Sequence, residues 1–396
     1  MTRVRVLFSF AGGVGHFLPT VVFARALARR GHEVRYACQE GMVNTVEAAG
    51  WPAEPTGGAS LLDRAARRPL APVDRAAEER VMAGFFAGKV AKERAGRLGE
   101  LIGRWEPEIV VRDEVDFGAA LAAEAAGLPH AAVAVIAAGR LTRPEVIETS
   151  LAEVRAELGL DPEDAVQALH RYLLLVPVPL SFRDPTVPLP DTARCVRPAV
   201  LEDLALAVGP VRARPVPHVY VTLGTIFPQE SGDLFQRALA GLATLPVEVT
   251  VTIGDAITPA ELGDLPATVR VEPFLPLGEI LPACDLVVSH GGSGTVIASL
   301  AFGVPQLVLA MGADQPDNAD RCRDLNVGLA LDPLSVSPAD IAGATTTVLR
   351  DPRYRGAAER MADEAHLLPG GDHAADLLEA IAEHAPPTPN DSRQRH

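Results

Sequence analysis

Leu286-Val287-Val288-Ser289 leads directly into the glycine-rich turn His290-Gly291-Gly292-Ser293-Gly294-Thr295, and this stretch decides the fold. The apolar run is typical of a buried strand, and the helical pattern Val296–Leu300 follows the turn. Unpaired N–H groups and the positive end of the helix dipole attract anions at such a junction, and glycines let a ligand approach the backbone. Ser293 and Thr295 add hydroxyl donors and His290 adds an imidazole. The stretch therefore predicts diphosphate binding, with a plain strand-to-helix turn as the alternative.

Strands and helices alternate on both sides of this stretch, which is typical of α/β proteins with parallel sheets. The first half opens with a strand at Val4–Phe10, a glycine turn at Ala11–Phe17 and a helix whose first residue is expected to be Pro19. Further strands are expected at Val34–Ala37, Ile109–Arg112, Val219–Leu223, Val247–Ile253, Val269–Val271 and Gln306–Leu309. Helices are expected around Glu78–Trp105 and at Gly118–Gly127, Leu234–Leu245, Thr295–Phe302, Pro316–Leu325, Ala339–Leu349, Tyr354–His366 and His373–His384.

A proline-rich linker at 209–217 divides the chain into two Rossmann-like halves, because its prolines and glycine disfavour regular structure. We expect domains at 1–208 and 218–372, a last helix at 373–385 and a disordered tail at 386–396. Ligands of such sheets bind beyond the carboxyl ends of the strands. The glycine turns Ala11–Phe17 and His290–Thr295 would therefore face each other across a cleft.

Composition excludes several classes of function. The chain has 396 residues and a net charge of −15, which argues against nucleic acid as a partner. No apolar run approaches the ~18–20 residues of a membrane span, so no stable membrane insertion is expected. The four cysteines, Cys38, Cys195, Cys284 and Cys322, contain no CxxC pair and are expected to be free thiols of a cytoplasmic protein. Metal-ligand spacings are missing, so neither a metal nor a cofactor is expected. A homodimer is compatible with the sequence.

Asp314 and Gln315 stand at a later strand-to-helix junction, with Pro316 at the expected first helical position. An adjacent carboxylate and amide accept and donate hydrogen bonds to neighbouring hydroxyls, as recognition of a polyol requires. A simple helix cap is the alternative, because aspartate favours helix N-termini. Gly224 and Thr225 follow the first strand of the second half, where Thr225 is either a second phosphate donor or part of an ordinary turn.

His16 lies in the glycine turn of the first half, which matches a dinucleotide fingerprint only at Gly13 and Gly15. Because imidazole titrates near neutrality, His16 is either an acid–base catalyst in the cleft or a structural histidine. Asp113 and Glu114 end another strand of the same sheet. One of these carboxylates is expected either to orient His16 or to cap the next helix.

Together these residues resemble the motifs of the bacterial natural-product glycosyltransferases, the antibiotic-tailoring branch of the inverting family 1. The resemblance covers nearly the whole chain and is carried by Gly15-His16-Phe17-Leu18-Pro19, by Arg112-Asp113 and by Pro273-Phe274-Leu275-Pro276-Leu277. It is most specific from Ser289–Thr295 through Phe302-Gly303-Val304-Pro305-Gln306 to Gly312-Ala313-Asp314-Gln315. It implies the GT-B fold, in which two Rossmann-like domains face each other across a cleft and the C-terminal helix crosses back to the N-terminal domain.

The resemblance also implies a role for each matching residue. His16 would be the general base that deprotonates an acceptor hydroxyl, and Asp113 would be its partner. The donor diphosphate would be held by His290, Gly292, Ser293, Gly294 and Thr295, with Gly224 and Thr225 assisting. Phe274 and Leu275 would pack against the nucleobase, and Asp314 and Gln315 would contact the sugar.

These observations predict an inverting, metal-independent transfer of a sugar from a dTDP- or UDP-sugar to a hydroxyl of a small hydrophobic natural-product aglycone. The tailoring branch implies a deoxysugar. Two departures leave the specificity open: Ala310-Met311 replaces a proline–aliphatic pair, and Leu277 stands where many relatives carry a glutamine near the ribose. The alternatives are a nucleotide-sugar epimerase of the same fold and a non-catalytic helper of a glycosyltransferase.

Overall fold

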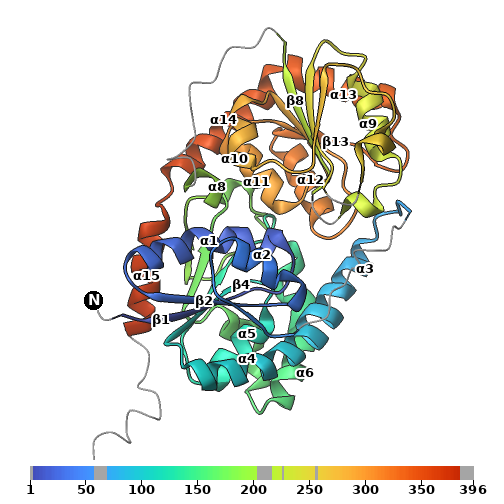
Figure 1. Ribbon diagram of the computed structural model, residues 1–396. Helices are drawn as coiled ribbons and strands as arrows, with labels where there is room; N and C mark the ends of the chain where they lie inside the picture. Colours follow the sequence, from blue (N-terminus) through green and yellow to red (C-terminus); the bar gives the residue numbers. More distant parts are fainter. Residues whose placement is uncertain (1–2, 58–68, 203–215, 225–226, 255–256, 384–396) are drawn as a thin grey trace, which may run out of the picture.

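The computed structural model describes residues 3–57, 69–202, 216–224, 227–254 and 257–383. It contains two parallel sheets with helices on both faces of each (Figure 1). The first sheet has seven strands in the order β3-β2-β1-β4-β5-β6-β7. Their bounds are β1 Arg5–Ser9, β2 Glu33–Cys38, β3 Ala53–Pro55, β4 Ile109–Asp113, β5 His130–Val133, β6 Leu173–Val176 and β7 Ala193–Cys195.

The second sheet has six strands in the order β10-β9-β8-β11-β12-β13. Their bounds are β8 His218–Thr222, β9 Glu248–Thr252, β10 Val269–Glu272, β11 Leu286–Ser289, β12 Gln306–Val308 and β13 Gly328–Ala330. Each sheet reverses its strand order once, between β1 and β4 in the first and between β8 and β11 in the second. Such switch points are where open α/β sheets bind ligands, beyond the carboxyl ends of the strands.

The helices fill the connections between these strands. In the first half they are α1 Val14–Arg29, α2 Val43–Ala48, α3 Arg75–Arg80, α4 Ala91–Trp105, α5 Phe117–Ala125, α6 Pro144–Glu157, α7 Ala165–Leu169 and α8 Ala199–Glu202. In the second half they are α9 Leu234–Leu242, α10 Leu277–Ile280, α11 Ser293–Ala301, α12 Gln315–Asp324, α13 Pro338–Arg350, α14 Pro352–Leu367 and α15 Gly371–Glu383. A π-helical segment, Val81–Val90, joins α3 to α4.

The expected start of the first helix at Pro19 is wrong. Helix α1 begins at Val14 and Pro19 lies inside it. Tertiary packing explains the earlier start, because the buried ring of Phe17 lies 5.4 Å from that of Phe10 and 5.2 Å from that of Tyr36. This packing draws the preceding turn into the helix. His16 therefore lies in the first turn of α1.

The C-terminal helix crosses back to the N-terminal domain, as the resemblance implies. In Figure 1, α15 in red lies beside α1 in blue. Nε2 of His32 lies 2.7 Å from Oε1 of Glu379, and both side chains are almost fully buried. Nη1 of Arg30 donates to Oδ1 of Asp376 and to Oε2 of Glu379. The buried His32–Glu379 pair and the more exposed contacts of Arg30 therefore hold α15 against the end of α1.

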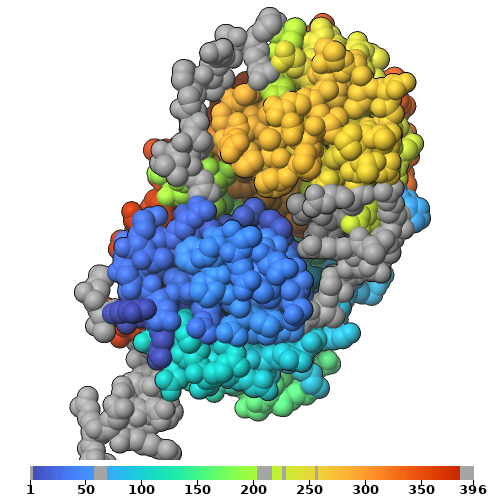
Figure 2. Space-filling view, in the orientation of Figure 1, coloured from blue at the N-terminus to red at the C-terminus, as the bar shows by residue number. Residues whose placement is uncertain are grey.

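In the space-filling view, the first lobe, in blue, lies directly against the second lobe, in orange and yellow (Figure 2). One apolar cluster spans this contact, with Ala137 and Phe182 from the first lobe and Val296 and Ala319 from the second. The expected linker lies mostly outside the described residues, as do the tail at 386–396 and the last residues of the first predicted domain. The four cysteines are free.

Candidate active site

The switch point of the first sheet brings His16 and Asp113 together. Asp113 ends β4, and its Oδ2 lies 3.2 Å from Nδ1 of His16. The same oxygen accepts a hydrogen bond from the backbone N–H of Ala11 at 2.8 Å. The other oxygen accepts from the N–H groups of Val115 and Asp116. Because four hydrogen bonds hold this fully buried carboxylate, it is a fixed partner for an imidazole that is 24% exposed.

The charges of the pair reinforce each other. Burial disfavours a charged imidazole, yet the neighbouring Asp113 carboxylate outweighs it and raises the pKa of His16 above its usual 6.5. Burial also opposes ionisation of Asp113, but the charge and hydrogen bond of His16 lower the pKa of that carboxyl. Asp314, from the other lobe, also acts on the charge of His16. The cleft thus places an oriented imidazole near a carboxylate of the second lobe.

The imidazole of His16 occupies space that a side chain at position 12 would fill, and residue 12 is a glycine. A Cβ atom added to Gly12 would lie 2.3 Å from Cδ2 of His16 and 2.7 Å from its Nε2. These distances are well below contact distance, so the ring fits only because residue 12 has no side chain. Gly15, in the same turn, has open space around its Cβ position.

Glu114 is not the partner of His16. Its Oε1 accepts hydrogen bonds from the backbone N–H groups of Val135 and Ile136, and Oγ1 of Thr142 donates to its Oε2. Burial raises the pKa of this carboxyl. Of the two carboxylates that the sequence left open, Asp113 therefore contacts His16, and Glu114 fixes the loop after β5.

The predicted diphosphate turn lies at the switch point of the second sheet. Gly292 is the N-cap residue of α11 and has no capping side chain. Within the described ranges, the backbone N–H groups of Ser293, Gly294 and Thr295 bind no acceptor. Gly294 is exposed. The N-terminus of α11 therefore offers several N–H donors to an anion.

His290 lies between two glycines of this turn region. Added Cβ atoms would lie 2.7 Å from its ring at Gly224 and 2.5 Å from its Nε2 at Gly292. Burial lowers the pKa of His290 to about 4, although a hydrogen bond to the backbone of Thr222 opposes this. The imidazole is therefore neutral near pH 7, so it offers a ligand a hydrogen bond and no positive charge. Thr225, which the resemblance assigns to the same diphosphate site, lies outside the described residues.

Ser293 joins the diphosphate turn to the predicted sugar contact. Its hydroxyl donates to Oδ2 of Asp314 and accepts from the backbone N–H of Ala137 in the other lobe at 2.6 Å. Burial raises the pKa of Asp314, while its hydrogen bonds with Ser293 and Asn318 oppose that rise. Asp314 is also the N-cap residue of α12, but its side chain makes no capping hydrogen bond. The carboxylate is therefore turned toward the turn of α11 and does not cap its own helix.

Gln315 and the predicted nucleobase residues differ strongly in exposure. Gln315 is 1% exposed, and its Oε1 accepts from the N–H groups of Met311 and Gly312. Its amide oxygen thus fixes the preceding loop. Phe274 is 60% exposed, which suits an aromatic surface for a base, whereas Leu275 packs partly into the apolar cluster beside α10.

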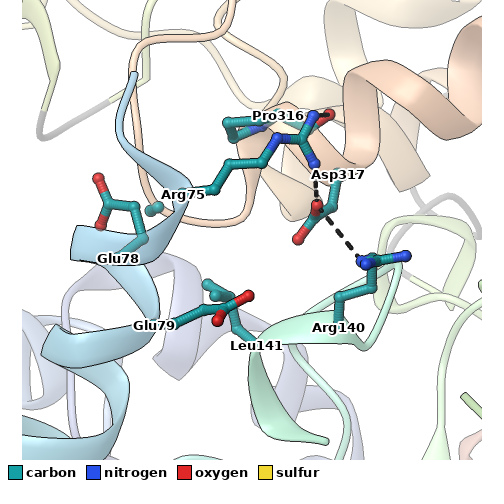
Figure 3. Close-up of a pocket in the computed structure, with 8 residues that line it drawn as sticks. Arg75, Glu78, Glu79, Arg140, Leu141, Pro316 and Asp317 are labelled. Atoms are coloured by element: carbon teal, nitrogen blue, oxygen red, sulfur yellow. Dashed lines mark hydrogen bonds and ion pairs between the residues drawn. The ribbon is translucent and has the colours of Figure 1, made fainter. Parts of the chain in front are cut away.

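Several residues near the cleft carry no sequence motif. Helix α3 reaches the second lobe through Arg75, whose guanidinium pairs with Asp317 (Figure 3). It also pairs with Asp320. Arg140 faces Asp317 from the other side. Asn318 is fully buried and contacts Asp314. The pairings of Arg75 and Arg140 with Asp317 join segments far apart in the chain, so no local pattern marks them. Asn318 lies only four residues beyond Asp314, and this spacing at the start of α12 is the local signal that could have pointed to it.

Among the residues that the structure describes, no group of three or more His, Cys, Asp or Glu side chains is arranged to hold a metal ion. No helix within the same ranges has the length and apolar character that crossing a membrane requires.

Sequence comparison gives the same picture over most of the chain. Residues 236–381 match the family described as erythromycin biosynthesis protein CIII-like, C-terminal domain. The L-demethylnoviosyl transferase of Streptomyces niveus is 32% identical, over 91% of this chain and 94% of that protein. The 4'-demethylrebeccamycin synthase of Lentzea aerocolonigenes is 30% identical, over 95% of this chain and 99% of that protein.

Solved structures agree with the fold. The glycosyltransferase VinC in complex with dTDP has a TM-score of 0.76 at 26% identity, covering 96% of this chain and 99% of that chain. The calicheamicin glycosyltransferase CalG4 has a TM-score of 0.77 at 25% identity, covering 98% and 100%. Two facing Rossmann-like domains with these motifs define a glycosyltransferase of the GT-B fold. More particularly, the chain belongs to the antibiotic-pathway glycosyltransferases with a CIII-like C-terminal domain.

Proposed function

We propose that this enzyme transfers a deoxysugar from a dTDP-sugar to a hydroxyl of a small, hydrophobic natural product, with inversion at the anomeric carbon. The observation that carries this proposal is that each sheet has candidate site residues at its switch point. His16 and Asp113 lie at the switch point of the first sheet. The N-terminus of α11, with its open N–H groups, lies at the switch point of the second sheet. Charge coupling between His16 and Asp314 supports their facing the same cleft.

The acceptor side supplies a base. An ionised carboxylate only accepts hydrogen bonds, so the Nδ1 of His16 that contacts Asp113 carries the proton and Nε2 keeps its lone pair. Nε2 then removes the proton of the acceptor hydroxyl as its oxygen attacks the anomeric carbon. Asp113 stabilises the imidazolium that forms. General base catalysis of this kind contributes about 10²–10⁴-fold in rate.

The donor side stabilises the leaving group. As the anomeric C–O bond breaks, negative charge develops on the departing nucleoside diphosphate. The N–H groups of Ser293, Gly294 and Thr295 and the positive end of the α11 dipole lie where they can stabilise that charge. Asp314 is proposed to bind sugar hydroxyls, and exposed Phe274 to pack against the base. A single displacement from the face opposite the diphosphate inverts the anomeric centre, and the proposed step uses no metal ion.

The proposed donor follows from the relatives. Several are named for deoxysugar transfer, including the 10-deoxymethynolide desosaminyltransferase of Streptomyces venezuelae, and VinC and SsfS6 were solved with dTDP and thymidine diphosphate. Because the relatives carry transferase names, the epimerase and helper alternatives are not favoured.

A thermal-shift panel of dTDP, UDP and GDP tests the nucleotide, because a ligand of the folded state raises the unfolding temperature by mass action. We expect the largest shift with dTDP. Product analysis with dTDP-deoxysugars and apolar phenolic or macrolide acceptors then tests transfer and anomeric configuration. No shift with dTDP or UDP, or a product with retained configuration, would contradict the proposal.

A further inference from the structure

The loop after β5, residues 134–139, is held from both lobes at once. The backbone N–H groups of Val135 and Ile136 donate to Glu114 of the same lobe. The next two N–H groups donate across the cleft, from Ala137 to Oγ of Ser293 and from Ala138 to Oδ1 of Asn318. Four successive N–H groups therefore divide between the two domains. We call residues 134–139 the bridging loop.

Both the amide nitrogen and the amide oxygen of Asn318 make hydrogen bonds. Its Nδ2 lies 2.9 Å from Oδ2 of Asp314, 2.9 Å from the carbonyl oxygen of Gly291 and 3.2 Å from Oγ of Ser293. Its Oδ1 accepts from Ala138 at 3.3 Å. The opposite amide orientation would place oxygen against these acceptors and nitrogen against an N–H donor, so the network fixes one orientation.

Burial makes the loss of any hydrogen bond in this network costly. Asn318 is fully buried, and the side chain of Asp314 is nearly so. A buried polar group that loses its partner pays its full desolvation cost, so the Asp314 carboxylate stays where its two donors, Ser293 and Asn318, hold it. Asn318 therefore helps to hold Asp314 in place and, through Ala138, supplies one of the hydrogen bonds between the lobes.

We propose that Asn318 is a positioning residue, which aligns Asp314 for the donor sugar and locks the donor lobe to the bridging loop. This inference rests on the proposed function, in which Asp314 binds the sugar. The bridging loop is held by Glu114, the neighbour of Asp113 that orients the base. Hydrogen bonds and the backbone segments 135–138 and 113–114 thus link the sugar contact to the base, and small displacements along this path misplace the reacting groups.

Two variants separate this role from a structural one. Asn318→Asp keeps an acceptor for Ala138 but replaces the donor that faces Asp314 with a carboxylate oxygen. Asn318→Ala removes both contacts. Arg321→Gln is the matched control, because Arg321 donates across the same domain contact to the carbonyl oxygens of Ser181 and Phe182, away from the donor site.

The readout is the affinity for dTDP-glucose relative to dTDP, measured by calorimetry, together with kcat. In both Asn318 variants this ratio should fall about tenfold or more, as loss of a charge-assisted hydrogen bond implies, while dTDP itself binds within about threefold of the wild-type affinity. Asn318→Ala should also lower kcat, and Arg321→Gln should leave ratio and kcat near those of the wild type.

Retention of the wild-type ratio in both variants would overturn the proposal, as would equal losses for dTDP and dTDP-glucose, since Asn318 would then only support the turn. If Asn318→Asp does not fold, the ratio in Asn318→Ala decides. Failure of the proposed function is seen separately, in the wild type, as no transfer of a sugar from dTDP- or UDP-sugars to any acceptor. If the wild type prefers UDP, the same ratio is measured with UDP-glucose and UDP.

Discussion

Oδ2 of Asp113 lies 3.2 Å from Nδ1 of His16, and this contact joins the first turn of α1 to the end of β4. The two residues are 97 positions apart in the chain. Neighbouring strands β1 and β4 bring them together at the switch point of the first sheet. Because the carboxylate is buried and fully hydrogen-bonded, it fixes both the tilt of the imidazole and the nitrogen that carries the proton.

Replacing His16 with glutamine should lower kcat about 10²–10⁴-fold, because the acceptor hydroxyl loses its base. The donor lobe is unchanged by this substitution, so dTDP should bind as it does to the wild type. Rates of product formation and calorimetric titration with dTDP check the two halves of the prediction. Wild-type turnover by His16→Gln would refute the assignment of the base but not the fold.

The rate should depend on pH through the His16–Asp113 pair. Asp113 raises the pKa of His16 above 6.5, and the base works only when neutral, so kcat/KM should fall as the pH drops through the raised value. Asp113→Asn removes the charge and leaves burial to lower that pKa, so the acidic limb should move to lower pH while the maximal rate also falls. An unshifted limb in the pH–rate profile of Asp113→Asn would show that another group controls it.

The same pair affects stability with a definite sign. The pKa of His16 is raised in the folded state, so the stability it contributes is fully present below 6.5 and is lost as the pH rises through the raised value. The lowered pKa of Asp113 contributes stability above 3.8 that is lost in acid. Chemical denaturation of wild type and His16→Gln at several pH values measures the first contribution as a difference that shrinks with rising pH.

Gly12→Ala should impair catalysis without unfolding the protein. The new Cβ would meet the His16 ring at 2.3 Å, so the imidazole must leave its place beside Asp113. Gly15→Ala is the matched control, since its Cβ meets nothing within 4 Å. We expect at least about a tenfold loss of kcat for Gly12→Ala, as follows when a general base loses its alignment. Similar rates for the two variants would mean that the ring position is not what limits the reaction.

Much of the fold is predictable from the sequence, because buried parallel strands read as short apolar runs followed by turns. The N-terminus of α1 could not be predicted in this way. Proline favours the first position of a helix, which pointed to Pro19, whereas the burial of Phe17 accounts for the actual start at Val14. Strands β5 to β7 lie in the proline-broken middle of the first half, where periodicity gives no clear pattern.

The site is only partly predictable. The turn of α11 has local signals, and the roles of His16 and Asp113 follow from family resemblance, but their contact depends on strand order. The inward side chain of Gln315 and the cross-lobe hydrogen bonds of Ser293 depend on how the lobes meet. No spacing within one segment encodes a contact of that kind.

The pairing of α3 with α12 should affect turnover in a salt-dependent way. Arg75 pairs with Asp317 and donates to the carbonyl oxygen of Pro316 (Figure 3). It also pairs with Asp320, so it holds α3 against the second lobe. Partly exposed ion pairs contribute about 0.2–1 kcal/mol each. Arg75→Ala should therefore lower kcat/KM about two- to fivefold at low ionic strength and raise hydrogen exchange in α3.

Arg80→Ala is the control for this prediction, because Arg80 lies on the same helix and its ion pair is local, with exposed Asp74 at 3.5 Å. Its kcat/KM and its exchange in α3 should match those of the wild type. Salt screens exposed charges, so the difference between Arg75→Ala and wild type should shrink as ionic strength rises toward about 1 M. Equal effects of the two substitutions, or a loss in Arg75→Ala that salt does not alter, would show that contact between α3 and α12 does not limit the reaction.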